Sequence, residues 1–180
     1  MTAIEDPIPL LEDLLGSYRA ELGADFPGYR NHVYRMAHFC LALRRCDDTE
    51  RRKILTAAAF HDLGIWVNRT VDYLPPSVAL AEAYLQRTGR QDWIPEIRSM
   101  IDMHHKIRRY ADPRYPLVEV FRRGDLVDFS LGLVSGGLPR AFIRDVKARF
   151  PNAGFHARLV QLARGWFARH PLRPPPFVKW

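Results

Sequence analysis

Apolar residues recur every three to four positions along nearly the whole chain, which is the spacing of one face of an α-helix. No stretch shows the alternation of apolar and polar residues that is typical of a half-buried strand. The amphipathic segments have the approximate bounds 11–22, 29–45, 49–62, 77–89, 92–106, 117–131, 142–150 and 159–167. At 180 residues the chain can bury one sizeable core. The sequence therefore predicts an all-α, single-domain bundle of about eight helices.

Proline, serine and glycine indicate where some of these helices begin and end. Ser77, after two prolines, is the predicted N-cap of the fourth helix, and Gly64 is predicted to end the third. Residues 171–180 contain four prolines and are predicted to form an extended tail on the surface or on a partner. We therefore expect a helical domain over 1–170 and a proline-rich tail over 171–180.

Composition narrows the class of protein and of partner. The net charge of +7, from 27 basic and 20 acidic residues, fits a small anionic substrate, and it fits equally well arginines that only solvate helix faces. Basic residues do not interleave with stacking aromatics, so polymeric nucleic acid is a disfavoured partner. No apolar run approaches the ~20 residues of a membrane span, and the first residues lack a signal-peptide pattern, so we expect a cytoplasmic protein with no membrane partner. Cys40 and Cys46 are expected to be free thiols. The sequence does not decide whether the chain forms a homo-oligomer.

Two histidines and two aspartates lie where predicted helices can direct them inward. His32 is on the second helix, the adjacent pair His61 and Asp62 ends the alanine-rich third helix, and Asp125 is on the sixth. Neighbouring side chains on a helix point about 100° apart, so the pair can face one ion only where the helix ends. A shell of two imidazoles and two carboxylates suits Mn, Fe(II), Co, Ni or Zn better than Ca. The sequence thus predicts one divalent transition metal at this site.

The order His, His-Asp, Asp, with its sequence context, resembles that of the HD-domain metal-dependent phosphohydrolase superfamily. The resemblance spans roughly His32 to Asp128, within a motif core of about 29–131. It implies an HD-type helical fold and the metal ligands His32, His61, Asp62 and Asp125. It also implies a hydrolase of a small phosphate ester, most often a nucleotide, with Asp62 as a catalytic residue. The family leaves three alternatives open: a di-iron oxygenase, a zinc hydratase, and a non-catalytic binding or regulatory protein.

A second pair of histidines, His104 and His105, follows Ile97 and Ile101 on the predicted fifth helix. Because they are adjacent, we expect only one of them to face the site. His104 is expected to lie closer to the stripe through Ile97 and Ile101, and His105, four residues after Ile101, is the alternative. In several branches of the family such histidines contact the substrate or hold a second metal. The segment 72–77, where two-metal members carry a further histidine, has none. We therefore expect one ion, with His104 or His105 as catalytic acid or substrate contact, and two ions as the alternative.

Three cations near these positions are candidates to bind the substrate phosphate: Lys106, Arg108 and Arg122. The alternative, which is at least as strong, is that all three are ordinary exposed cations on the surface. Ile65 follows the glycine after His-Asp, where many relatives place a lysine, so the substrate cannot be transferred from those branches. Arg35, one turn after His32, recurs in the family's first motif and is expected to brace it.

Overall fold

The computed structural model describes residues 3–179, and its regular elements are helices. Eight of them have eight or more residues: α1 (Pro9–Gly16), α3 (Phe26–Leu43), α4 (Asp48–Phe60), α6 (Leu74–Arg87), α7 (Ile94–Met103), α8 (Pro116–Phe129), α9 (Arg140–Arg149) and α10 (Phe155–Arg169). The shorter elements are α2 (Arg19–Leu22), α5 (Gly64–Val67) and the 3₁₀ turns Gly23–Asp25 and Gln91–Trp93. Each predicted segment overlaps one of the eight long helices. The predicted all-α, single-domain bundle is therefore confirmed.

Local chemistry explains most helix starts. Proline occupies the first turn of α1, α3, α6, α7 and α8, where its missing N–H has no partner to lose. A capping box starts α4, in which the Asp47 carboxylate accepts from the Glu50 backbone N–H at 2.7 Å. The prediction that Ser77 caps α6 was wrong, because the helix already begins at Leu74. Ser77 is instead a buried residue inside α6.

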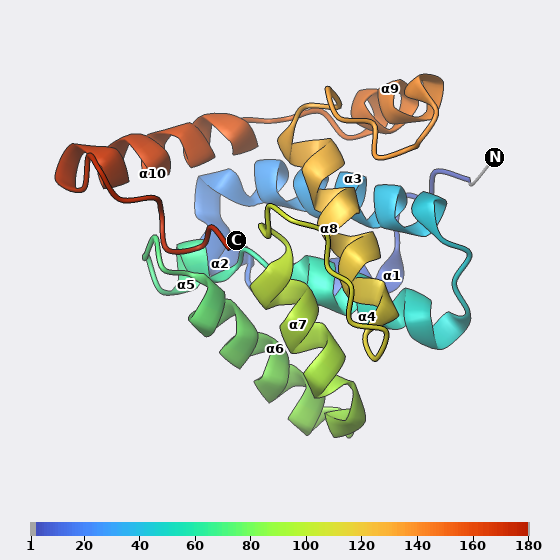
Figure 1. Cartoon of the computed structure of the whole chain (residues 1–180). Helices are drawn as coiled ribbons and strands as arrows, with labels where there is room; N and C mark the ends of the chain where they lie inside the picture. Colours follow the sequence, from blue (N-terminus) through green and yellow to red (C-terminus); the bar gives the residue numbers. More distant parts are fainter. Residues whose placement is uncertain (1–2, 180) are drawn as a thin grey trace.

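The helices that carry the predicted site residues pack together in the core. Helix α3 runs across the molecule, and α8 crosses it (Figure 1). Helix α4 packs against α3, α7 and α8, and α7 also packs against α8. Phe39, Phe60 and Phe121, from α3, α4 and α8, are at most 1% exposed where these helices meet. The candidate site thus lies within the best-packed part of the bundle.

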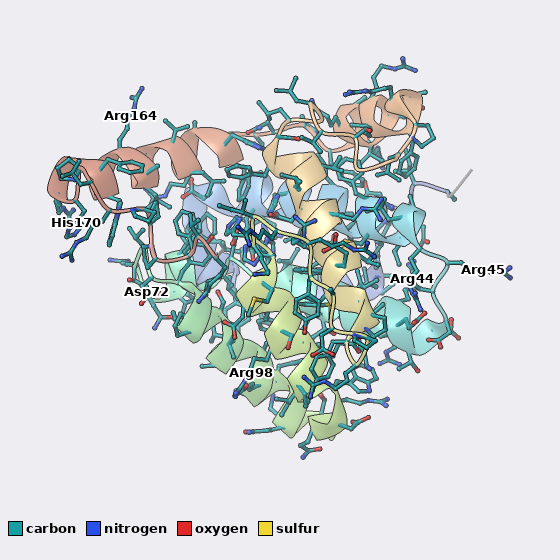
Figure 2. The ribbon with its side chains drawn as sticks, viewed as in Figure 1. Arg44, Arg45, Asp72, Arg98, Arg164 and His170 are labelled. Carbon is teal, nitrogen blue, oxygen red and sulfur yellow. The ribbon has the colours of Figure 1, made fainter. Side chains whose placement is uncertain are left out.

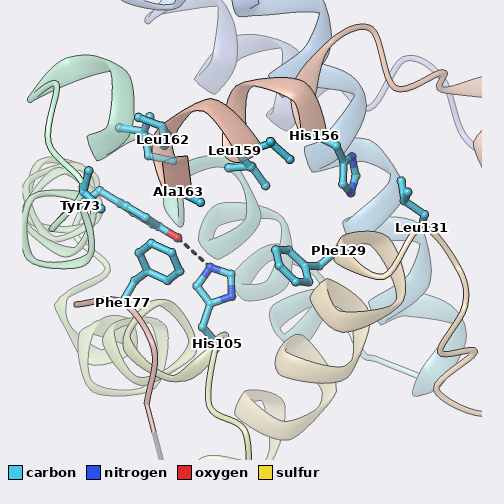
Figure 3. Close-up of a pocket in the computed structure, with 12 residues that line it drawn as sticks. Tyr73, His105, Phe129, Leu131, His156, Leu159, Leu162, Ala163 and Phe177 are labelled. Carbon is cyan, nitrogen blue, oxygen red and sulfur yellow. Dashed lines mark hydrogen bonds between the residues drawn. The ribbon is translucent and has the colours of Figure 1, made fainter. Parts of the chain in front are cut away.

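The C-terminal segments form one edge of the molecule. Helix α10 extends away from the bundle, and the residues after it return to the centre (Figure 1). The Phe177 ring then lies 5.3 Å from the Tyr73 ring and 5.1 Å from the His105 ring (Figure 3). The Lys179 carbonyl accepts from the Ile107 N–H at 2.9 Å. The last described residues of the predicted tail therefore lie on the bundle, whereas Leu172 near its start is 95% exposed. Trp180 is outside the described residues.

Basic side chains extend from several sides of the surface, as Arg45, Arg98 and Arg164 do in Figure 2. Both cysteines are free, as predicted. Among residues 3–179, we find no helix that is both long and apolar enough to cross a lipid bilayer.

Candidate metal centre

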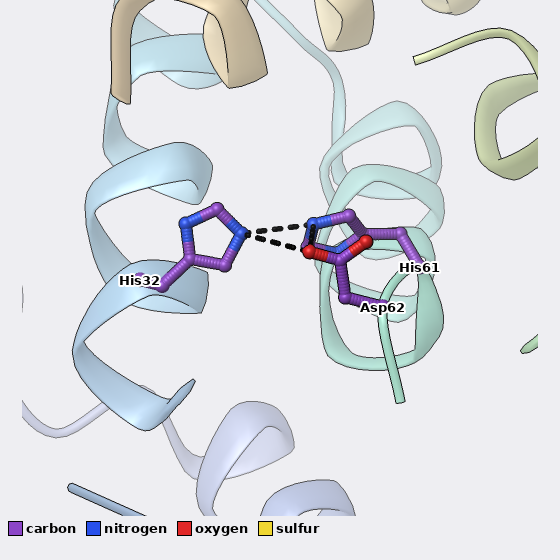
Figure 4. A group of neighbouring side chains, drawn as sticks. All are labelled: His32, His61 and Asp62. Atoms are coloured by element: carbon purple, nitrogen blue, oxygen red, sulfur yellow. Dashed lines mark hydrogen bonds and ion pairs between the residues drawn. The ribbon is translucent and has the colours of Figure 1, made fainter. Parts of the chain in front are cut away.

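Helices α3, α4 and α8 bring the four predicted ligand residues to one buried place. The Nε2 atoms of His32 and His61 are 2.9 Å apart (Figure 4). Asp62, in the turn after α4, places Oδ2 3.7 Å from His32 Nε2 and 3.4 Å from His61 Nε2. Asp125 Oδ1, from α8, lies 4.0 Å from each of the same two nitrogens. All four residues are at most 3% exposed.

The turn after α4 lets the adjacent His61 and Asp62 face the same point. Helix α4 ends at Phe60, so the predicted break at the pair is present. Gly64 does not end the helix as predicted, because it is the first residue of α5. A Cβ on Gly64 would lie 2.5 Å from the Tyr73 carbonyl oxygen, and the Gly64 N–H donates to the Ser77 hydroxyl at 2.9 Å. This glycine is needed for close packing of α5 against α6.

Hydrogen bonds on the far side of each ring direct the imidazole lone pairs into the cluster. His32 Nδ1 donates to Asp128 Oδ2 at 2.6 Å, and His61 Nδ1 donates to the Ala58 carbonyl at 2.8 Å. An imidazole that donates from Nδ1 carries its lone pair on Nε2 when it is neutral. The two facing Nε2 atoms therefore need a shared proton or a metal cation between them.

His104 and His105 both contact this cluster, so the prediction that only one of them faces the site was wrong. Helix α7 ends at Met103, and the helical 100° separation does not apply to the turn that follows. His104 Nδ1 donates to the Ile101 carbonyl at 2.7 Å, and its Nε2 lies 3.4 Å from Asp62 Oδ1. His105 Nδ1 lies 3.6 Å from Asp125 Oδ2.

The buried donors form two overlapping groups that fit divalent metal. One contains His32, His61 and Asp62, and the other contains Asp62, His104 and His105, with one ligand atom per residue and all such atoms within 4.8 Å of one another in each group. Asp62 Oδ1 and His104 Nε2 are buried without a hydrogen-bond partner. Unsatisfied buried polar atoms are costly, and a cation would satisfy both. Mixed nitrogen and oxygen donors suit first-row transition metals.

The electrostatics of the cluster also favour a bound positive charge. Burial lowers the pKa of His32 to about 4. Burial opposes protonation of His61 as well, but the Asp62 and Asp125 carboxylates outweigh it and raise the pKa of His61 to about 9. Burial raises the pKa of Asp125 to about 6. The carboxylates thus stabilise a cation at His61, whether it is a proton or a metal.

Asp128 and Tyr73 are site residues that the sequence analysis missed. Asp128 accepts from His32 and also from Arg35, whose Nη2 lies 2.9 Å from Asp128 Oδ2, so Arg35 braces His32 through a carboxylate. The Tyr73 hydroxyl is 2.7 Å from His105 Nε2. Asp128 follows Asp125 by three positions on a helix, and that spacing was the available signal. Nothing local to Tyr73 indicates its partner.

No protein-family model, curated protein or solved structure matches this chain. The resemblance to the HD-domain superfamily therefore stays a prediction. Function is therefore inferred from the donor set, its burial and the space beside it.

A cavity of about 340 Å³ opens beside the cluster and contains two of the three predicted phosphate-binding cations. Lys106 and Arg122 line it together with His104, His105 and Asp125. Arg122 is already engaged, because it makes two hydrogen bonds of 2.8 Å to the Glu119 carboxylate. Arg108 is exposed and does not line the cavity. The cavity is where a substrate would reach the buried donors.

Proposed function

We propose that this chain is a metal-dependent hydrolase of a small phosphate ester, of the HD-domain type that its motifs resemble. The observation that carries the proposal is the convergence of three buried imidazole lone pairs, from His32, His61 and His104, on two buried carboxylates. His32, His61, Asp62 and Asp125 would hold one divalent ion of Mn, Fe, Co, Ni or Zn. When bound, the ion would supply positive charge to a phosphoryl group and acidify a water molecule.

His105 is the residue best situated to contact the substrate or move a proton. Its side chain is 13% exposed, whereas that of His104 is fully buried. One ring nitrogen of His105 is directed at Asp125 and the other at the Tyr73 hydroxyl, so a proton on either nitrogen has a partner. Lys106 borders the same cavity and would attract an anionic group.

A second ion is the alternative that one observation favours. Asp62 belongs to both donor groups, and its Oδ1 is left without a hydrogen-bond partner next to His104 Nε2. A carboxylate with one oxygen in each group can serve two ions. The ratio of metal to protein distinguishes the two forms.

The test combines metal content with turnover. Protein purified without chelator should contain one equivalent of transition metal, or two in the alternative form. It should also hydrolyse members of a panel of phosphomonoesters and nucleotides after loading with Mn, Co, Ni or Zn. Asp62→Ala should lose both properties because it removes a ligand shared by both donor groups. His105→Ala should keep the metal and lower kcat/KM by about 10²–10⁴, the usual contribution of a proton-transferring group.

His170→Ala is the matched control, because His170 lies at the far end of α10 (Figure 2), and this variant should keep metal and activity. A metal-loaded protein that is inactive on the whole panel would contradict the proposal. Two bound irons would then support the oxygenase alternative, and one zinc the hydratase. A protein with no metal would support a binding or regulatory role.

A further inference from the structure

A second cavity, of about 310 Å³, lies on the other side of His105 and is mostly apolar. Its walls come from α10, the end of α8, the segment before α6 and the returning tail (Figure 3). Apart from His105 and His156, its lining side chains are aliphatic or aromatic, among them Phe129, Leu159, Leu162 and Phe177. Its size is at the lower end of the range for small-molecule sites.

This apolar cavity adjoins the candidate metal centre. His105, Phe129 and Phe177 line both the apolar cavity and the cavity that contains Lys106 and Asp125. His105 therefore stands between them, with Nδ1 3.6 Å from Asp125 Oδ2 and its other side directed at Tyr73. A ligand whose charged end lies at the donor cluster could extend past His105 into the apolar cavity.

The polar atoms in the walls already have partners. The Tyr73 hydroxyl is hydrogen-bonded to His105. His156 Nε2 donates to the Asp128 carbonyl at 3.1 Å, and its Nδ1 faces the Asn152 amide. A nucleobase or a sugar placed here would leave its own donors and acceptors unpaired, which costs about 1–3 kcal/mol for each buried group. The walls thus select against the polar parts of a nucleotide.

The rest of the protein covers little of the apolar side of α10. Across residues 155–169, all of them described, Phe155 alone is buried, and Val160 remains 50% exposed. Phe129 and Leu131, at the end of α8, are each 49% exposed. Binding of a ligand that removes this apolar surface from water is favourable, because burial of apolar surface lowers the free energy.

We infer that the apolar cavity binds an alkyl or aryl group carried by the substrate, so that the substrate class is an apolar phosphate ester rather than a nucleotide. The inference rests on the proposed function for the position of the anionic end. Leu159, Leu162 and Ala163 of α10 would contact the apolar group, and Phe177 of the tail would close over it.

The test measures binding of n-alkylphosphonates, which resist hydrolysis, to the metal-loaded protein by calorimetry. Affinity should rise about three- to fourfold with each added methylene until the cavity is full, since each buried methylene contributes a similar transfer free energy. A series from methyl- to octylphosphonate with no dependence on chain length would overturn the inference.

Two variants of α10 provide a matched comparison. Ala163→Phe fills the cavity and should abolish the dependence on chain length while leaving methylphosphonate affinity unchanged. Ala168→Phe makes the same substitution at an exposed position of the same helix, outside the cavity, and should behave like the unmodified protein. Circular dichroism would verify that both variants fold. A chain-length dependence that survives in Ala163→Phe would also overturn the inference.

Because the readout is binding, the two proposals can fail separately. Length-dependent binding without hydrolysis of any ester would support the apolar site and contradict the proposed function. Hydrolysis of short esters, together with an affinity that does not depend on chain length, would support the proposed function and contradict the apolar site.

Discussion

At the scale of single residues, Asp128 connects the stability of the core with the orientation of His32, a proposed metal ligand. It accepts from His32 Nδ1 and from the buried Arg35 guanidinium, which also donates to the Phe150 carbonyl at 2.9 Å. Such carboxylate partners fix the tautomer of a ligating histidine. The Arg35 charge, in turn, is compensated inside the protein by this one carboxylate, since no other ion pair of Arg35 occurs among residues 3–179.

We predict that Asp128→Asn lowers metal affinity by about 10–100-fold, because the amide offers His32 and Arg35 one acceptor oxygen in place of a carboxylate. It should also lower the free energy of unfolding by about 3–5 kcal/mol, because a buried charge loses its counterpart. Metal titration and urea unfolding measure the two effects. The double variant Arg35→Met, Asp128→Leu removes both charges and should be more stable than the single variant. Wild-type stability in Asp128→Asn would contradict this account.

At the scale of helices, α3 and α8 approach so closely at Gly124 that there is no room for a larger residue. A Cβ there would meet Cys40 Sγ and would lie 3.2 Å from the Cys40 backbone nitrogen. Asp125 is the next residue, so this contact also determines how near α8 brings its carboxylate to His32. Close packing of the two helices is therefore part of the site's geometry.

We predict that Gly124→Ala costs about 1–3 kcal/mol of unfolding free energy through overpacking, measured by chemical denaturation. Gly165→Ala is the control on another helix, since a Cβ at Gly165 meets nothing within 4 Å. It should stabilise the protein by up to about 1 kcal/mol through helix propensity. Equal effects of the two substitutions would show that the α3 and α8 contact is not close.

At the scale of the whole molecule, the donors come from α3, α8 and the turns after α4 and α7, so a bound ion would hold the bundle together. An ion present at about 100 times its Kd stabilises the folded state by about 2.7 kcal/mol. For a chain of this size that corresponds to an increase in Tm of about 5–10 °C. Calorimetry with and without metal should show this increase in the wild-type protein and not in Asp62→Asn. The same increase in both proteins would indicate metal binding elsewhere.

The amino-acid pattern was sufficient to predict the helical segments and the kinds of side chain that could bind metal. Helix hydrogen bonds join residues four apart, so the spacing of apolar residues was enough to predict all eight long helices. The adjacent His61 and Asp62 even predicted the break at the end of α4. Local patterns were less reliable for boundaries, as Ser77 and Gly64 illustrate.

Which of these side chains meet, and what space lies beside them, depends on how the helices pack in three dimensions. His32 and Asp128 are 96 positions apart, and no local pattern pairs them. His104 and His105 both reach the cluster because a turn, rather than a helix, carries them. The apolar cavity exists because α10 extends past the bundle and the tail returns beneath it (Figure 1). Contacts of this kind depend on how every helix packs at once, which the spacing of residues along one helix does not specify.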